Sequence, residues 1–227
     1  MEDFGILLSI ITLNIVLSGD NAVVIAMAGR NLPEDQQRKA ILIGSGGAIV
    51  FRIILTVAAF YLLKIPFVQA AGGLMLIYIA IKLLTQKESC EEYQAACSLM
   101  DAVKIIIFAD IIMSLDNTLA IVAVAKGSWL MLLIGLATSI PIIIFCSKII
   151  MYFMNKYPII IYIGAGILAW TSGEMVIQDE KVMTFLAGFL PHMVHRVFPL
   201  VVTIAVLLYG WRHNMKSSEG TLNTHSQ

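Results

Sequence analysis

The sequence predicts an all-α polytopic membrane protein with seven transmembrane helices, arranged as two inverted three-helix repeats followed by one C-terminal helix. Three observations predict this fold. Of the 227 residues, 59% are hydrophobic and only 13% are charged, whereas a soluble domain carries about 25% charged residues. Seven apolar stretches approach the roughly 20 residues that a spanning helix needs. A polar phrase inside the first stretch recurs inside the fourth.

The seven stretches occupy most of the chain, and they are continuous rather than alternating, which favours helices over outer-membrane strands. No basic region or small-residue cleavage site accompanies the first stretch, so we read it as a retained helix and not as a signal peptide. Residues 1–215 are expected to form a single transmembrane domain, and the polar residues 216–227 a disordered tail. The expected helices are Phe4–Ala28, Ala40–Leu63, Phe67–Thr85, Ala102–Ala125, Trp129–Met154, Tyr157–Ile177 and Val194–Trp211.

The repeated phrase reads NxxxSGDN over residues 14–21 and DxxxSLDN over residues 110–117, with the two copies 96 residues apart. A second match, KxP followed by glycine, starts at Lys64 and again at Lys156. These matches place repeat 1 at about residues 4–85 and repeat 2 at about 102–177. Because each repeat has three helices, the two copies insert in opposite orientations. Inverted repeats are typical of secondary transporters with a site at the bilayer midplane.

The distribution of basic residues predicts the orientation in the membrane. With the N-terminus outside, the cytoplasmic loops hold the larger share of Lys and Arg, as the positive-inside rule requires. We therefore expect a multi-pass plasma-membrane protein with its C-terminus in the cytoplasm. The net charge of zero does not indicate a nucleic-acid partner, and a homo-oligomer is compatible with the sequence. The inner basic residues are Arg30, Arg38, Lys39, Lys87, Lys156, Arg212 and Lys216, and the outer ones are Lys64, Lys126, Lys181 and Arg196.

The two phrases carry the candidate chemistry. A carboxylate costs at least about 2.5–3.5 kcal/mol to insert at the bilayer centre, so a chain that places one there twice is expected to use it. The phrases supply carboxylate, amide and hydroxyl oxygens without His or Cys, a donor set that suits Mg²⁺, Ca²⁺ or Mn²⁺. Two nearby carboxylates repel each other, and either a divalent cation or a proton removes that repulsion. The candidate metal ligands are Asp20, Asn21, Asp116, Asn117, Asp110, Asn14, Ser18 and Ser114, with Thr118 as a further hydroxyl.

Helical geometry limits how these groups converge. At about 100° per residue, the first, fifth and eighth residues of each phrase share one stripe, and the aspartate at the seventh position points about 120° away. Convergence therefore requires a broken helix or a crevice between neighbouring helices. Gly19 permits a break in the first copy, whereas Leu115 gives no such help in the second. The glycine-rich residues 44–47 and Pro141 predict close packing or a kink beside the phrases.

Other polar residues within or beside the spans have simpler interpretations. Arg52 lies deep in its span and is expected to pair with a carboxylate, acting as a counter-charge when the metal leaves. Lys82, Lys148 and Glu174 lie nearer the ends of their spans, where snorkelling is the ordinary role; for Glu174 a metal-ligand or proton-carrier role is the alternative. The pair His192 and His195 lacks the further ligands that a metal site needs.

The segment Leu17–Ala22, taken with the second phrase at residues 110–117, resembles the TerC family of integral membrane proteins, and more closely its YjbE-type branch of short seven-helix members. This family belongs to the LysE-like transporter superfamily, and its members are associated with manganese export and tellurium resistance. The resemblance implies Mn²⁺ efflux, with Mn²⁺ as the transported substrate and no organic cofactor. It implies a site at Asp20, Asn21, Asp116 and Asn117.

Three alternatives remain open at this point. The LysE-like relatives export amino acids or other small solutes, whose ammonium group would also suit the two aspartates. An intramembrane aspartyl protease also needs two membrane aspartates, but its usual GxGD phrase is absent because position 17 is Leu; we expect no enzymatic activity. A role in loading metal into secreted enzymes is compatible with export.

Overall fold

In the computed structural model the chain is helical, as predicted, and no strand occurs in the part of the chain that is described. That part comprises residues 8–9, 12, 19–62, 65–86, 98–124, 129–186 and 194–224, without the side chains of 56–62, 115–124, 129–133, 135–140 and 216–224. The helices are α2 (Gly19–Gly29), α3 (Glu34–Leu62), α4 (Val68–Thr85), α5 (Leu99–Val124), α6 (Trp129–Lys156), α7 (Ile159–Gln178), α8 (Glu180–Leu186) and α9 (Val194–Thr224).

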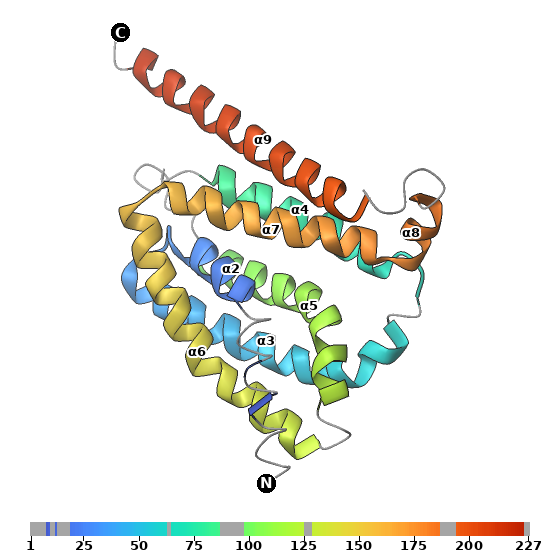
Figure 1. The fold of residues 1–227 in the computed structure, drawn as a ribbon. Coiled ribbons are helices and arrows are strands. Elements are labelled where there is room, and N and C mark those ends of the chain that lie inside the picture. The colour runs from blue at the N-terminus through green and yellow to red at the C-terminus, as the bar shows by residue number, and fades with distance from the viewer. Residues whose placement is uncertain are drawn as a thin grey trace.

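The helices run between two ends of the molecule, with successive long helices reversing direction (Figure 1). At one end, which we call the Arg30 end, α2, α4 and α6 finish and α3, α5 and α7 begin. Arg30 donates hydrogen bonds from Nη2 to the carbonyl oxygens of Leu83 at 3.3 Å and Gln86 at 3.2 Å, which ties the turn after α2 to the end of α4. At the opposite end, the backbone N–H of Ala70 donates to Oδ2 of Asp179 at 3.4 Å, which joins the start of α4 to the residue after α7.

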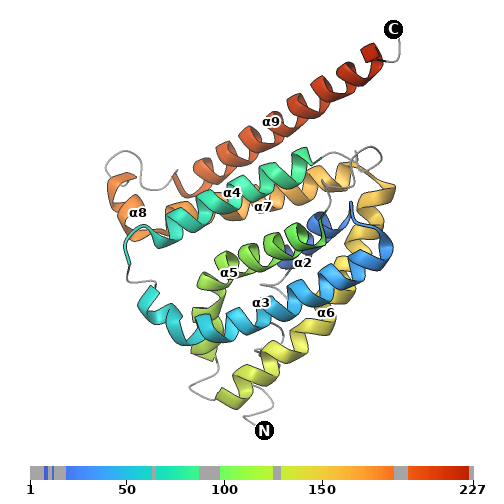
Figure 2. The same cartoon turned by 180° about the vertical axis from the view of Figure 1, so that it is seen from behind.

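The helices of the first predicted repeat pack against those of the second in a largely symmetric pattern. Helix α2 packs on α5, α3 on α6, and α4 on α7. Most of the remaining contacts within this group come in matched pairs, because α3 packs on α5 as α2 does on α6, and α4 packs on α5 as α2 does on α7. The small contacts of α2 with α3 and of α6 with α7 have no counterpart of similar extent, so exchanging the first three helices for the second three reproduces most of the contact pattern. In Figure 2 the pair α4 and α7 lies between α9 on one side and the group α2, α3, α5 and α6 on the other.

Helix α2 is the centre of the fold. All its residues from Asn21 to Gly29 are buried, although a helix on the surface of a protein would bury only one face. Its neighbours are α5, α6 and α7, with a smaller contact to α3. This position places the Asp-Asn phrase of the first repeat inside the molecule.

The outer surface is strongly apolar. Large apolar side chains are exposed on α3, α4, α6, α7 and α9, for example Val50, Leu74, Phe145, Ile163 and Ile204. Such extended apolar exposure suits contact with lipid and not with water. Among the described helices, α4 and α7 are long and apolar enough to cross a membrane by length and composition.

Helices α4 to α7 follow their predicted bounds closely, and three differences concern other segments. Helix α3 begins at Glu34, within the hydrophilic segment that was expected to be a loop up to Lys39. Pro33 precedes it and acidic residues occupy its first turn, both of which favour a helix start. The short helix α8 was not predicted, and Asp179 caps it by accepting hydrogen bonds from the N–H groups of Lys181 at 3.0 Å and Val182 at 3.4 Å.

The third difference is at the C-terminus. We expected the last helix to end near Trp211, but α9 continues to Thr224. No proline interrupts this segment, and helical hydrogen bonds are made within it, so the helix extends beyond its apolar part. Asn214 fixes the beginning of this extension, because its Nδ2 donates to the hydroxyl oxygen of Tyr162 at 3.0 Å.

Candidate metal centre

The first Asp-Asn phrase lies at the start of α2, near the middle of the molecule (Figure 1). The backbone N–H of Asn21 donates to Oδ1 of Asp20 at 2.9 Å, which gives a partner to one of the N–H groups that the first turn of a helix leaves unpaired. The Asp20 side chain is half-buried, and Asn21 is 3% exposed. The described helix thus begins at Gly19, the residue that we expected to permit a break. Residues 13–18 lie outside the described part, so the break itself stays a prediction.

The second phrase contributes a buried ionic network. Arg52 of α3 forms an ion pair with Asp110 of α5, through Nη2 and Oδ1. Nε of Arg52 also donates to Oγ of Ser114 at 3.0 Å, and that hydroxyl donates to Oδ2 of Asp110 at 3.2 Å. All three side chains are buried, with Ser114 at 0% exposure. The predicted stripe of Asp110 and Ser114 and the predicted pairing of Arg52 with a carboxylate are both confirmed.

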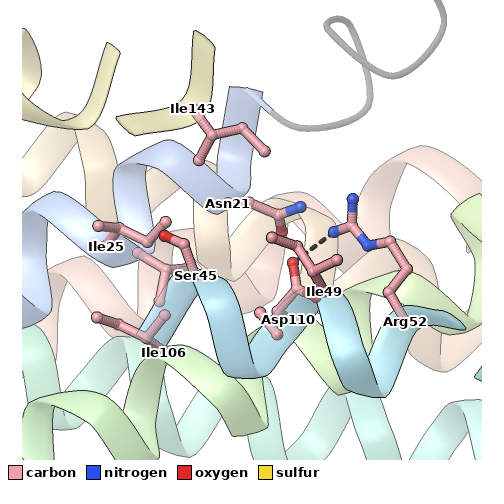
Figure 3. Close-up of a pocket in the computed structure, with 10 residues that line it drawn as sticks. Asn21, Ile25, Ser45, Ile49, Arg52, Ile106, Asp110 and Ile143 are labelled. Carbon is pink, nitrogen blue, oxygen red and sulfur yellow. Dashed lines mark hydrogen bonds and ion pairs between the residues drawn. The ribbon is translucent and has the colours of Figure 1, made fainter. Parts of the chain in front are cut away.

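A cavity brings the two phrases together, because Asn21 of α2 and Asp110 of α5 both line it. Figure 3 shows Asn21 beside the ion pair of Arg52 with Asp110, and Ser45 on the same helix as Arg52. The cavity volume is about 30 Å³, and since one water needs about 10–15 Å³ on this measure, it holds about two waters. Its other lining residues are apolar: Val24, Ile25, Ala48, Ile49, Ile106 and Ile143.

Two polar side chains at this cavity have no hydrogen-bond partner among the described residues. They are Asn21, at both Oδ1 and Nδ2, and Ser45 at Oγ. Burying such groups without a partner costs roughly 1–3 kcal/mol each on protein scales and more in a lipid setting. Two oxygen atoms with unused lone pairs therefore face the same space as a carboxylate, which is the arrangement that a bound cation would satisfy.

With both carboxylates ionised, the described side chains of the centre carry a negative excess. Asp20 lies close enough to Arg52 and Asp110 for the charges of both to act on it. Among the described side chains of the centre, two carboxylates thus stand against one guanidinium. In a low-dielectric surrounding an uncompensated carboxylate strongly attracts a cation.

The structure brings together four of the eight predicted ligands: Asp20, Asn21, Asp110 and Ser114. Asn14 and Ser18 lie outside the described residues. Helix α5 runs unbroken through Leu115, so the second copy of the phrase has no break. No group of three His, Cys, Asp or Glu side chains gathers within the described residues. The phrase continues on α5 with three residues whose side chains are outside the description: Asp116, Asn117 and Thr118.

Sequence reasoning missed Ser45 as an oxygen donor, because it reads only as part of a glycine-rich packing segment. Close packing is confirmed at that segment. A Cβ added to Gly44 would lie 2.9 Å from Cγ2 of Ile106, and one added to Gly47 would lie 2.7 Å from Cδ1 of Ile107. The only available signal for Ser45 was a hydroxyl within an apolar span, flanked by residues that admit a neighbouring helix.

The other polar residues lie away from this centre. Lys82 and Lys148 are exposed, Glu174 is half-buried on α7, and His195 is exposed at the start of α9. His192 lies outside the described residues. Asp179, which precedes the histidine pair in the chain, is occupied as the cap of α8.

Comparison with known proteins identifies the family of the chain. The model of the integral membrane protein TerC family matches residues 1–218. Over 202 residues the chain is 43% identical to the uncharacterized membrane protein YjbE of Bacillus subtilis, covering 89% of this chain and 92% of the relative.

More distant relatives are membrane proteins as well. The uncharacterized membrane protein YceF of B. subtilis is 31% identical over 165 residues, covering 68% of this chain and 64% of the relative. The inner membrane protein YgdQ of Escherichia coli K12 is 22% identical over 185 residues, covering 74% and 78%. No solved structure matches the chain. With a family match over nearly its whole length, this chain is a membrane protein that belongs to the TerC family.

Proposed function

We propose that this protein transports a divalent cation, Mn²⁺ in the first place, across the plasma membrane through a centre built from both Asp-Asn phrases. The observation that carries the proposal is the cavity between α2, α3 and α5. There Asn21 and Ser45, whose side-chain oxygens have no hydrogen-bond partner among the described residues, line the same cavity as Asp110. Asp20, Asp116 and Asn117 complete the proposed donor set.

The donor chemistry supports a hard cation. Carboxylate, amide and hydroxyl oxygens suit Mn²⁺, Mg²⁺ and Ca²⁺, and no His or Cys lines the described cavity. A cation bound there would satisfy the Asn21 and Ser45 oxygens and the negative excess together. Mn²⁺ is preferred among these ions because of what membership of this family implies.

The helix contacts support an inverted-repeat architecture. In that architecture α2, α3 and α4 correspond to α5, α6 and α7, and most of the observed contacts keep their pattern when these sets are exchanged. The two phrases then approach each other across a pseudo-two-fold axis near the midplane, as in transporters that work by alternating access. We propose seven spans, with the N-terminus outside and the Arg30 end in the cytoplasm.

Arg52 has a defined part in this cycle. In the structure its guanidinium holds both Asp110 and Ser114, so the buried carboxylate is paired. A cation that takes Asp110 as a ligand competes with the guanidinium for that carboxylate. Arg52 therefore serves as a tethered counter-charge when the centre is empty.

The cavity argues against the amino-acid alternative. A free amino acid occupies several times the space of the two waters that fit here. A small ion fits both the volume and the charge.

The test is ion flux into proteoliposomes, with Mn²⁺, Ca²⁺, lysine and a pH gradient varied independently. We expect Mn²⁺ flux in the wild type and none in Asp20→Asn or Asp116→Asn. In cells, both variants should lose Mn²⁺ resistance at near-normal abundance. Asp35→Asn, an exposed position in the first turn of α3, is the matched control and should keep full flux. Lysine flux without Mn²⁺ flux would replace the proposal with the amino-acid alternative, and full resistance in both variants would exclude the site.

A further inference from the structure

A second cavity lies at the Arg30 end. It has a volume of about 50 Å³ and is formed where the end of α2, the start of α5 and the end of α4 meet. Unlike the first cavity, it is bordered by exposed polar side chains, among them Asp101 and Lys82. Asn31, Gln86 and Ser98 add further polar groups. This cavity is therefore a polar vestibule at one surface of the molecule.

The two cavities lie along one seam between α2 and α5. On α2 and the turn after it, the residues lining the first cavity and then the second are spaced by three or four, which is one helical stripe. The lining residues of α5 have the same spacing, but their residue numbers decrease from the first cavity to the second. The α2 side of the seam is Asn21, Val24, Ile25, Ala28, Asn31 and Leu32. The α5 side is Asp110, Ile106, Ile105, Ala102, Asp101 and Ser98.

The length of the seam matches the distance from the bilayer midplane to its surface. Asp101 and Asp110 are nine residues apart on one helix, or about 13 Å along its axis. Half of the hydrocarbon core is about 15 Å thick. A path along α2 and α5 therefore leads from the buried centre to the aqueous boundary without crossing another layer of helices.

Between the two polar ends the seam is entirely apolar. Ile25 of α2 is 4% exposed, and Ile105 and Ile106 of α5 are 8% and 2% exposed. Ile106 is held in place from behind, because it fills the space at Gly44 of α3 where a Cβ would be only 2.9 Å from its Cγ2. Apolar constrictions of this kind block ions by excluding water.

We propose that the seam between α2 and α5 is the route by which a cation passes between the Asp110 centre and the Arg30 end. In this structure the route is closed by a gate of Ile25, Ile105 and Ile106, and the vestibule at Asp101 is its mouth. The inference rests on the proposed function, because it takes the centre at Asp110 as the cation site. It adds the path, the gate and the side of the membrane from which the centre is reached.

The test measures access to the central cavity, which needs no transport. Ser45 lines that cavity and is 6% exposed, so a Ser45→Cys thiol in a background without Cys90, Cys97 and Cys146 reports on it. The probe is trimethylammonium-ethyl methanethiosulfonate, a cationic and membrane-impermeant thiol reagent, applied to one side of oriented vesicles. The rate of thiol modification is measured from each side.

Opening the gate should raise the rate of thiol modification at Ser45→Cys only when the reagent is applied from the Arg30 side. We expect a roughly tenfold or greater increase for Ile106→Ala, and a similar one for Ile25→Thr, which keeps a β-branched side chain but adds a hydroxyl. The second variant covers the case in which the first does not fold, as judged by size-exclusion chromatography. The matched control is Ile112→Ala, because Ile112 is also buried on α5 but lies beyond Asp110, away from the seam.

The inference is overturned if folded gate variants modify no faster than the wild type, if Ile112→Ala has the same effect, or if the faster access comes from the opposite side. The outcome is separate from that of the flux assay. If the gate variants speed thiol modification but the protein transports no Mn²⁺, the proposed function is refuted and the route stands. Mn²⁺ flux with access unchanged by the gate variants would refute the route alone.

Discussion

The guanidinium of Arg52 on α3 holds the carboxylate of Asp110 on α5, and Ser114 closes the network by contacting both. The ion pair joins two helices that belong to different predicted repeats. It is buried, with the two side chains at 6% and 10% exposure. The same carboxylate faces the cavity that we propose as the cation centre, so its pairing controls both the stability and the function of the centre.

Removing Arg52 should destabilise the protein strongly. In Arg52→Met the Asp110 charge is left buried without its cationic partner, and breaking a buried pair in this way costs about 3–5 kcal/mol. The double variant with Asp110→Asn removes the charge as well, and should recover much of that loss. Thermal unfolding in detergent of the two single variants and the double variant measures the coupling. Losses that simply add in the double variant would show that the two side chains do not act as a pair.

Substitution of Asn21 should stabilise the protein, whereas substitution of Arg52 should destabilise it. Because its amide is buried without a described partner, Asn21→Leu removes an unsatisfied polar group and should raise the apo stability, by roughly 1–3 kcal/mol. The same change removes a proposed ligand, so stabilisation by added Mn²⁺ should fall. Thermal unfolding with and without Mn²⁺ separates the two effects, and Ser45→Ala is a parallel case at the same cavity. A variant that is less stable without metal would mean that the amide has a structural partner.

The helices could be predicted well from the sequence because the apolar stretches are long and are bounded by polar residues. Helices α4 to α7 begin and end within three residues of the predicted bounds. The early start of α3 and the helix α8 were missed because both depend on capping in polar segments and not on apolar length.

The site could be predicted in part. Asp110 and Ser114 share a face because of helical spacing, which is a local property, and this was foreseen. That Arg52 would meet Asp110 and not another carboxylate depends on how α3 packs on α5. The glycines at 44 and 47 set that contact, and the sequence alone does not state which helix they admit. Ser45 was missed for the same reason.

Glycine substitutions should separate close helix packing from free space. A Cβ on Gly73 would lie 2.7 Å from the backbone oxygen of Ser172 and 2.6 Å from Cγ2 of Val176, so Gly73→Ala must push α4 away from α7. Overpacking of this kind costs roughly 1–3 kcal/mol. At Gly46 the same change meets no atom within 4 Å, and it should stabilise α3 by roughly 0.5–1 kcal/mol. Comparison of the melting temperatures of the Gly73→Ala and Gly46→Ala variants tests this packing. Equal shifts in the two variants would contradict it.

Asp101, at the mouth of the proposed route, should affect the rate of transport but not the affinity of the centre. It is exposed and lies about 13 Å along the helix from Asp110, too far to be a ligand of the same cation. Its charge therefore acts mainly on cations that approach the vestibule. In Asp101→Asn we expect Mn²⁺ flux at low concentration to fall a few-fold, with the difference lost at high salt. Stabilisation of the purified protein by Mn²⁺ should not change, and Asp35→Asn, exposed on α3, is the control for the loss of a surface charge. If Asp101→Asn lowers Mn²⁺ binding at equilibrium, or if the loss of flux persists at high salt, then Asp101 is a ligand or a structural residue and the vestibule does not work by attracting cations.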